Sequence, residues 1–539
     1  MFSTELPPTQ SAVTPAFTDV ADCEKWLSQL QYTNIAQTHQ SVAAQVGLLN
    51  AFTLPAAMRL AILEKLREPV SFVQAEYAKR VLLKALPFND AELAAFQSIL
   101  ALWEAMQSGY RRCLNAAGED AALSEAQLCQ RVIGYLGLQF LEHYRAGYEF
   151  DAALWQRLHR AYAFAETQQV AVENVDDTRN ETGQISSAAL YARILLVSQA
   201  SPYELSRAQQ HQMESWLNLW AKIVRVSATV PATQNDVPPL EIDLDGAQGA
   251  YYCNAAPVAG ASLRYLDTSA LNNEMQINLA LLQKGKSPED LGLGRDCVQP
   301  DCAEFMARLR QLWCDGRSTR FLERHPVTDK ADVCFGINGA HVYTTGSAFT
   351  QPKQSGKLTA QQQKEIAAFG HVVSHTGEGG GTGLQQLGFP LETWSVMDKS
   401  ALGARLMREK AAGERVSHNR LIGFRQRGSE FYLLAAIRWI MVSRTGAPQL
   451  GVRILPGVPQ PLSLRAAGLG VKPADPYVQA FMLPAVAALQ TPPTLVLPGG
   501  WYAHKRNVEI LQDSVAKTVT LDFLVERGAD YERVSFTAA

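Results

Sequence analysis

The sequence predicts a multidomain α+β protein with an N-terminal helical domain, a mixed α/β middle region, an antiparallel β-barrel that carries an insertion, and a small C-terminal β domain. A chain of 539 residues is too long for one core, and at roughly 150 residues per domain it suggests three or four domains. Apolar residues recur at spacings of three and four up to about residue 168, which is typical of helices. After residue 331, short apolar runs alternate with turn residues, which is typical of antiparallel β structure.

The overall composition argues against several classes of protein. With 47% hydrophobic and 19% charged residues, the chain has the composition of an ordinary soluble globular protein. Its net charge of −3 argues against bulk binding to a nucleic acid polymer. No apolar run approaches the ~18 residues of a membrane span. Residues 1–19, expected to be disordered, lack the basic start and apolar block of a signal peptide, so we expect a cytoplasmic location.

The eight cysteines are scattered along the chain and do not form a recognisable metal site. The closest group, Cys297, Cys302 and Cys314, lacks paired Cys-x-x-Cys knuckles. We expect reduced, mostly buried thiols and no resident cofactor. His371 and His375 stand four positions apart, but no glutamate follows the first histidine as in His-Glu-x-x-His. A metal is therefore not expected there either.

Residues 20–172 are expected to form a helical domain. No histidine or carboxylate cluster interrupts its apolar stripes, so a bundle that packs its own core is the favoured interpretation. A docking surface for a protein partner is the alternative, and any such partner is expected to use this domain. The clearest stripe repeats at three- and four-residue intervals through Leu93, Phe96, Leu100, Trp103, Met106 and Tyr110.

A mixed α/β domain is expected over residues 188–310. A strand is predicted at Tyr191–Val197 and an amphipathic helix at Glu204–Lys222. The piece Asp267-Thr-Ser-Ala-Leu271 echoes a later piece, Asp398-Lys-Ser-Ala-Leu402. This similarity leaves two possibilities open: the middle domain is a degenerate copy of the barrel that follows, or the match is a coincidence.

The β-barrel is expected over residues 316–460. Apolar runs at Ala331–Ile337 and Ala340–Tyr343 flank Asn338-Gly339, a strong signal for a tight hairpin. The polar, glycine-rich stretch at about 344–390 is interpreted as an insertion between strands. Its run from Gly377 to Gly383 lacks the Lys-Ser/Thr ending of a phosphate loop, so a flexible hinge is the favoured interpretation.

The later β region is expected to form further strands. Arg438 and Trp439 lie in a long apolar strand, where we expect core packing. A separate C-terminal β domain is expected over residues 476–539, because apolar and more polar residues alternate from Val519 to Val525.

Two short motifs in the β region carry the functional hypothesis. Arg320-Phe-Leu-Glu-Arg324 precedes the first strand, and Asp398-Lys-Ser-Ala-Leu-Gly403 lies where a later strand turns. A guanidinium is planar and always charged, and it can bind a phosphate or the O6 and N7 atoms of guanine bidentately. Asp398 can accept from guanine N–H groups, Ser400 can reach a further polar atom, and Gly403 permits close approach. Arg317 belongs to the same basic cluster, either as a helper or as a solvated arginine.

These motifs resemble those of the PilZ domain, the bacterial family of cyclic di-GMP receptors. The resemblance covers residues 316–460 and implies a six-stranded barrel, with Arg320 and Arg324 in the arginine places and Asp398, Ser400 and Gly403 in those of the turn. It implies cyclic di-GMP as the ligand, and outputs such as motility, pili or biofilm matrix. One departure stands out: Arg324 and Asp398 are 74 positions apart, whereas the family usually has a few tens. The insertion could therefore cover or remodel the site.

We therefore expect a non-enzymatic, cyclic di-GMP-binding signalling effector. The ligand would order the arginine segment against the Asp-x-Ser-x-x-Gly turn and alter domain or partner contacts. The alternative is a degenerate PilZ-like scaffold that serves protein contacts and does not bind nucleotide. An enzyme would need a polar constellation that the sequence does not show, since Ser374 and Ser400 lack the glycines of a nucleophile elbow.

Overall fold

The chain divides into two compact units, residues 1–84 with 88–321 (unit 1) and residues 85–87 with 322–539 (unit 2). The computed structural model describes residues 6–10, 14–82, 84–117, 123–179, 183–231, 237–252, 260–299, 301–316, 325–352, 388–409, 413–468, 475–513 and 515–538.

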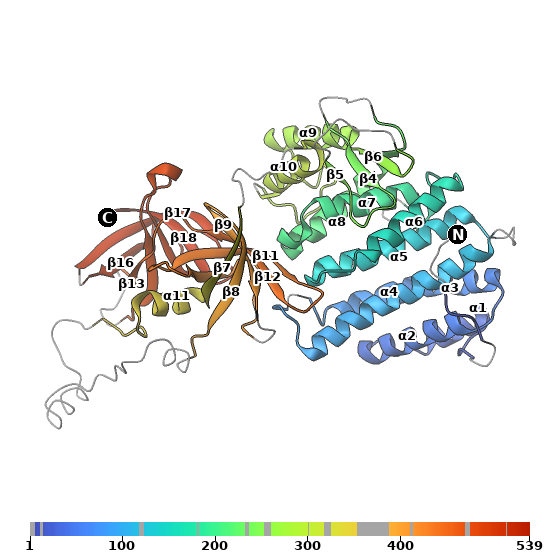
Figure 1. Ribbon diagram of the computed structural model, residues 1–539, viewed down its shortest axis with the longest axis horizontal. Coiled ribbons are helices and arrows are strands. Elements are labelled where there is room, and N and C mark those ends of the chain that lie inside the picture. Colours follow the sequence, from blue (N-terminus) through green and yellow to red (C-terminus); the bar gives the residue numbers. More distant parts are fainter. Residues whose placement is uncertain are drawn as a thin grey trace, which may run out of the picture. The chain divides into compact units, whose positions relative to one another are not determined.

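Unit 1 begins with a helical bundle (Figure 1). The predicted apolar stripe of α4 is confirmed, because Phe96, Trp103, Met106 and Tyr110 are buried. The helix begins with a capping box, in which the Asn89 side chain accepts from the Glu92 N–H at 2.9 Å and the Glu92 carboxylate accepts from the Asn89 N–H at 3.0 Å. The bundle comprises α1 (Val20–Ser28), α2 (Ile35–Ala51), α3 (Ala56–Ala78), α4 (Asp90–Ala116), α5 (Glu125–Ala146) and α6 (Ala153–Thr167).

The middle region adds a small sheet and further helices to unit 1. The sheet has the strand order β3-β6-β4-β5, so it is open and four-stranded. The structure places this region in one unit with the bundle instead of separating it at residues 173–187. Its elements are β1 (Val175–Asp176), β2 (Gln184–Ile185), α7 (Ser187–Gln199), α8 (Arg207–Trp220), β3 (Arg225–Ser227), β4 (Leu240–Asp243), β5 (Tyr251–Tyr252), β6 (Leu263–Asp267), α9 (Ser269–Gln283) and α10 (Asp301–Cys314).

The strand predicted at Tyr191–Val197 is wrong, since these residues belong to helix α7. Tyr191, Leu195, Leu196 and Val197 are all buried. A helix buried on most sides has a continuous apolar run with no visible period, and such a run cannot be distinguished from a buried strand. The helix predicted at Glu204–Lys222 is confirmed as α8.

The internal echo does not mark a repeated structure. Asp267 ends a strand and Ser269 begins helix α9, whereas Asp398 and Ser400 lie in one strand of a hairpin. The open four-stranded sheet of the middle region also differs from a closed six-stranded barrel. Tertiary context therefore gives the two similar pieces different conformations.

Unit 2 contains two closed, antiparallel, six-stranded barrels (Figure 1). The first barrel has the order β10-β11-β12-β9-β8-β7, and the second has the order β13-β14-β15-β18-β17-β16. The strands of the first are β7 (His325–Phe335), β8 (Leu391–Ser400), β9 (Gly403–Arg408), β10 (Leu421–Gln426), β11 (Leu433–Val442) and β12 (Pro448–Ile454). Those of the second are β13 (Gln460–Ala466), β14 (Val478–Leu483), β15 (Thr494–Pro498), β16 (Asn507–Gln512), β17 (Val515–Arg527) and β18 (Tyr531–Ala538).

The second barrel begins earlier than the sequence suggested. Its first strand starts at Gln460 and pairs with β14 and β16, whereas the C-terminal domain was expected to start at residue 476. The Pro/Gly-rich composition near Pro456 and Pro461 resembles a linker, but Leu462 and Leu464 turn into the barrel core and are buried.

The hairpin predicted at Asn338-Gly339 is also wrong. Strand β7 ends at Phe335, and the turn residues lie inside helix α11 (Gly336–Thr345). Ile337 and Ala340 are buried in a core that the two barrels share. Their burial at helical spacing outweighs the local turn propensity. Of the expected insertion at about 344–390, residues 353–387 lie outside the described residues, including His371, Ser374, His375 and the glycine run.

One apolar core joins the two barrels within unit 2. Leu421, Leu434 and Leu455 of the first barrel pack with Phe481 and Tyr531 of the second. All five side chains are 6% exposed or less. The barrels therefore form one body and not two independent domains.

Three further expectations concern the cysteines, metal sites and membrane spans. Cys297 and Cys302 form a disulfide, which corrects the prediction of reduced thiols for these two, whereas the other described cysteines are free and buried. Across the residues described above, no group of metal-ligating side chains is found. Within that same part of the chain, no helix has the length and apolarity needed to cross a membrane.

Candidate functional site

The Asp-x-Ser-x-x-Gly motif forms the hairpin between β8 and β9. Ser400 pairs with Gly403, and Asp398 pairs with Arg405. The carboxylate of Asp398 lies 3.8 Å from the Arg405 Nε, and the Ser400 hydroxyl lies 3.5 Å from the Gly403 carbonyl oxygen. The motif residues therefore come together at the end of a strand pair, as the sequence predicted. Paired residues present their side chains on the same face of a sheet.

Arg317, Arg320 and Arg324 lie outside the described residues. The described chain resumes at His325, which is covalently next to Arg324 and is the first residue of β7. His325 pairs with Lys399, and the next residue, Pro326, pairs with Asp398. The described chain therefore resumes directly beside the hairpin, at the residue that follows the arginine motif in the sequence.

A row of outward-facing residues crosses the first barrel next to this hairpin. Trp439 of β11 pairs with Gly451 of β12, Gly451 pairs with Arg405 of β9, and Arg405 pairs with Asp398 of β8. A Cβ atom added to Gly451 would lie 1.8 Å from the Trp439 Nε1. The indole therefore lies directly over Gly451. Any other residue at position 451 would place its side chain where the ring lies.

The prediction that Arg438 and Trp439 pack in a core is wrong. The register of β11 and β12 shifts between Ile437 and Trp439. This bulge interrupts the alternation: Ile437 and Ile440 are buried, Arg438 is exposed and Trp439 is partly exposed. Gly451 is an isolated glycine within an apolar strand, and such a glycine often marks a position that another group approaches closely. It is the sequence signal that could have indicated the position of the Trp439 ring.

A further arginine lies beside the motif. Arg453 of β12 pairs with Gly403 across the barrel surface, and its guanidinium forms an ion pair with Glu526 of β17. The Tyr531 hydroxyl donates to the other carboxylate oxygen of Glu526 at 2.8 Å. Burial by itself would raise the pKa of Glu526, but the hydrogen bond and charge of Arg453 hold it below its ordinary value.

Sequence reasoning missed Trp439, Arg405 and Arg453, because no local motif marks them. With Asp398 and Ser400, these residues provide an aromatic face, two guanidinium groups, a carboxylate and a hydroxyl on one surface of the barrel. An aromatic face can stack on a base, and guanidinium groups bind phosphates. The arrangement can therefore bind a nucleotide.

Comparison with known proteins agrees with this chemistry. Residues 21–232 match the family model described as the N-terminal domain of the cyclic-di-GMP receptor FimW. Residues 464–539 match the model described as the FimW C-terminal beta-barrel domain, and this range lies within the second barrel. The first barrel lies between the two matched ranges.

A curated relative matches across most of the chain. It is the cyclic-di-GMP receptor FimW of Pseudomonas aeruginosa, 22% identical over an alignment of 535 residues that spans 91% of this chain and 86% of the relative. The matched models and this relative are described as belonging to a receptor, which is a binding effector, and this agrees with the expectation of a non-enzymatic protein. Over residues 21–232 and 464–539, this chain is thus similar to the N-terminal and C-terminal domains of the cyclic-di-GMP receptor FimW.

Proposed function

We propose that this chain is a cyclic di-GMP-binding effector whose ligand site is a PilZ-like surface of the first barrel. The observation that carries the proposal is the register of β7 and β8, in which His325 lies across from Lys399. This register brings the residue that follows Arg324 to the Asp398–Gly403 hairpin. The two motifs can then act on one ligand despite their separation of 74 positions.

Each side chain has a role that its chemistry suits. Arg320 and Arg324 bind a phosphate or a guanine edge bidentately. Asp398 accepts from the guanine N–H groups, and Ser400 binds a further polar atom. The exposed face of Trp439 stacks on one base. Arg453 supplies a further positive charge for a phosphate.

The ligand acts as a switch by ordering the segment from Arg317 to Arg324 against the hairpin. Binding then changes the contacts of the chain that leads into β7. Arg453 extends the effect to the second barrel, because Glu526 and the ligand phosphate compete for one guanidinium.

Isothermal titration calorimetry with cyclic di-GMP tests the proposal. We expect the wild type to bind, and Arg320→Ala and Arg324→Ala each to weaken binding by about tenfold or more, since a charged hydrogen bond contributes about 1.5–3 kcal/mol. Arg308→Ala is the matched control, because Arg308 is ion-paired with Glu204 at 2.7 Å in unit 1. Equal affinity in the wild type and in both motif variants would refute the site.

A scaffold that does not bind nucleotide is the second candidate. Phe523 and Val525 of β17 are 67% and 49% exposed, and two neighbouring apolar side chains on one strand face suit a protein contact. Thermal shift separates the candidates, because a ligand at 100 times its Kd stabilises the folded state by about 2.7 kcal/mol. No shift with cyclic di-GMP would favour the scaffold.

We also propose that a protein partner docks on the helical part of unit 1. Tyr32 and Phe72 pack edge to face with ring centroids 5.8 Å apart, and both remain exposed, at 38% and 50%. Exposed aromatic pairs are typical of interface anchors. Phe72→Ser is expected to abolish crosslinking to the partner without changing cyclic di-GMP affinity.

A further inference from the structure

A cleft of about 550 Å³ lies in unit 1, far along the chain from the barrel motifs. Helix α5 supplies Gly134, Leu138 and Glu142 to its lining at four-residue intervals, so these residues share one face of the helix. Helices α3, α4, α7 and α8 supply the other sides. A volume of this size falls in the range of about 300–1,000 Å³ for small-molecule sites.

One part of the lining is apolar and holds an unused donor. Phe96, Trp103, Leu138 and Leu190 contribute to it. Trp103 is only 5% exposed, and its Nε1 has no hydrogen-bond acceptor among the described residues. A buried N–H without an acceptor is unfavourable by roughly 1–3 kcal/mol, so it favours a ligand that brings an acceptor.

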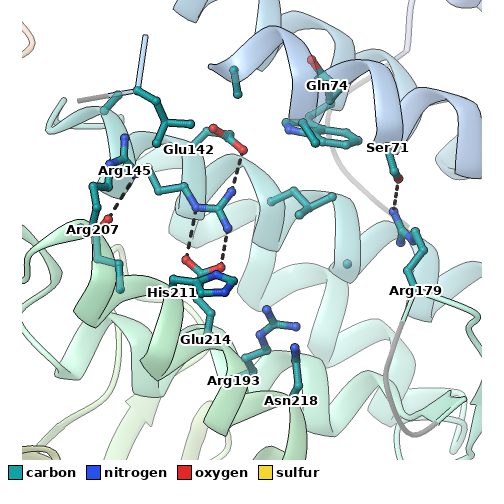
Figure 2. A pocket seen from close by; sticks show the side chains of 18 of the residues that line it. Ser71, Gln74, Glu142, Arg145, Arg179, Arg193, Arg207, His211, Glu214 and Asn218 are labelled. Atoms are coloured by element: carbon teal, nitrogen blue, oxygen red, sulfur yellow. Dashed lines mark hydrogen bonds and ion pairs between the residues drawn. The ribbon is translucent and has the colours of Figure 1, made fainter. Parts of the chain in front are cut away.

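The other part of the lining is cationic. Arg145 lies between two carboxylates, donating to Glu142 at 3.0 Å and to both carboxylate oxygens of Glu214 (Figure 2). These two carboxylates are therefore engaged. The nearby Arg207 donates to the Gln210 side chain at 3.3 Å and forms no ion pair within the described part of the chain.

The surroundings of Arg207 disfavour its positive charge. Burial, and then the charge of Arg145, lower the pKa of Arg207 to about 10, although Glu142 and Glu214 offset part of this effect. Arg145 engages both Glu142 and Glu214, so Arg207 has no ion-pair partner of its own among the described residues. An anion bound beside Arg207 would balance its charge.

A narrow apolar pocket continues the cleft between α5 and α7. It has a volume of about 50 Å³ and shares Gly134, Leu138, Leu190 and Arg193 with the cleft. Gly137 lets the two helices approach, since an added Cβ would lie 2.7 Å from the Ile194 Cδ1. Apart from Arg193, the lining residues are apolar or glycine, so the pocket has room for the end of a small apolar group.

We propose that the cleft binds a small amphipathic anion, with its apolar body against Trp103, Leu138 and Leu190 and its acidic group at Arg207. The acidic group is a carboxylate, sulfonate or phosphate, and the apolar body is either a planar ring system or a short alkyl chain. All of these residues belong to unit 1, so the proposal does not depend on the cyclic di-GMP site.

The full-length protein is titrated with 1-anilinonaphthalene-8-sulfonate, a planar apolar anion whose fluorescence rises in an apolar site. We expect saturable binding of one probe per chain. Arg207→Gln is expected to weaken it at least fivefold, while Arg308→Gln, which alters an arginine outside the cleft, leaves it unchanged. The uncharged N-phenyl-1-naphthylamine is expected to bind more weakly to the wild type and equally to Arg207→Gln.

A second variant blocks the cleft without touching a charge. Ala75 lines the cleft from an exposed position on α3. Ala75→Trp should therefore fill the cleft with little change in the free energy of unfolding. We expect it to abolish probe binding, whereas Ala101→Trp, at an exposed position of α4 outside the lining, does not. Displacement by decanoate identifies an alkyl acid as the ligand class, and displacement by 2-naphthoate identifies an aromatic acid.

Three results would overturn the proposal. The first is no saturable binding of any of the three anions to the wild type. The second is unchanged probe affinity in both Arg207→Gln and Ala75→Trp, which would show that the probe binds elsewhere on the protein. The third is equal affinity for the charged and uncharged probes. Because cyclic di-GMP affinity is measured on the same samples, a failure here is distinct from a failure of the proposed function.

Discussion

Arg453 of β12 and Glu526 of β17 form an ion pair between the two barrels, and the same arginine lies across from Gly403. The Arg453 side chain is 37% exposed, whereas that of Glu526 is 16% exposed. The pair therefore places a competitor for Arg453 at the edge of the proposed ligand surface. A phosphate that binds Arg453 must replace this carboxylate or share the guanidinium with it.

This competition predicts opposite effects for the two partners. Glu526→Gln is expected to raise cyclic di-GMP affinity about threefold, because it removes the charge that holds Arg453. Arg453→Ala is expected to lower the affinity about tenfold, as for loss of one charged hydrogen bond. Calorimetry measures both. Glu509→Gln is the control, since Glu509 pairs with Arg465 at 2.9 Å in the second barrel; an unchanged affinity in Glu526→Gln would rule out the competition.

The indole of Trp439 is expected to stack on a base. Trp439→Ala should therefore weaken cyclic di-GMP binding about tenfold, within the range of about 1–3 kcal/mol for stacking on one base. Calorimetry provides the affinity, and quenching of tryptophan fluorescence provides an independent signal that should shrink in the variant. Phe431→Ala is the control, because Phe431 is 58% exposed on the same barrel. The role fails if both variants bind as the wild type does.

Gly451 is expected to act through Trp439 alone. Gly451→Ala places a methyl group where the indole lies, at 1.8 Å from the Nε1, so the ring must move and affinity should fall as in Trp439→Ala. In a Trp439→Ala background the same glycine change should have no further effect on affinity. Additive losses in the double-mutant cycle would show that Gly451 matters for another reason.

Cyclic di-GMP is expected to protect the arginine segment from trypsin. Trypsin cleaves after arginine, and bound ligand would engage Arg320 and Arg324. Mass spectrometry of timed digests should show slower cleavage after Arg317, Arg320 and Arg324 with ligand present, and an unchanged rate after the exposed Arg295. Equal rates after all four arginines would contradict ligand-induced ordering.

A buried ionic network in unit 1 predicts a pH-dependent stability. The Asp177 carboxylate accepts from Arg67 at 2.7 Å and from Gln130 at 2.9 Å. Burial by itself would raise the pKa of Asp177, but the charges of Arg179 and Arg67 and the hydrogen bond from Gln130 hold it well below its ordinary value. A lowered folded-state pKa stabilises the protein above the unfolded value of about 3.9, and this stability is lost as the pH falls through the folded value.

Asp177→Asn is therefore expected to lower the free energy of unfolding by about 3 kcal/mol at neutral pH. The difference from the wild type should shrink below about pH 4, because the Asp177 carboxyl of the unfolded wild type then binds a proton before that of the folded protein does. Circular dichroism at 222 nm follows the helices of unit 1 during urea unfolding. Asp176→Asn is the control, because this neighbouring aspartate is exposed; a pH-independent difference would exclude the charge of Asp177 as the cause.

Periodic patterns predicted much of the fold. The helical stripe of α4 was visible because this helix has one buried face. The alternation in β17 predicted the strand, but only Val519 and Leu521 of its apolar residues are buried there, whereas Phe523 and Val525 are exposed. The prediction failed at α7, which is buried on most sides, and at α11, where the core around Ile337 and Ala340 outweighs an Asn-Gly turn signal. In both cases the outcome depends on which surfaces are covered by elements distant in the sequence, and the local sequence does not determine this.

The candidate site was predictable only where a short motif marks it. Asp398, Ser400 and Gly403 are within one hairpin, so their spacing in sequence sets their positions in space. Trp439 and Arg453 reach the same surface only through strand pairing and a bulge in β11. Such long-range register depends on the closed barrel, and no single segment of the chain encodes it.

The core that the barrels share has a practical consequence for dissecting the protein. A fragment ending at residue 459 would leave Leu421, Leu434 and Leu455 facing water, because Phe481 and Tyr531 would be missing. Truncation to the nucleotide motifs alone is therefore expected to yield an aggregating product. A fragment meant for study in isolation should therefore contain both barrels. A chimaera between homologues should likewise exchange the two barrels together, because each covers part of the core of the other.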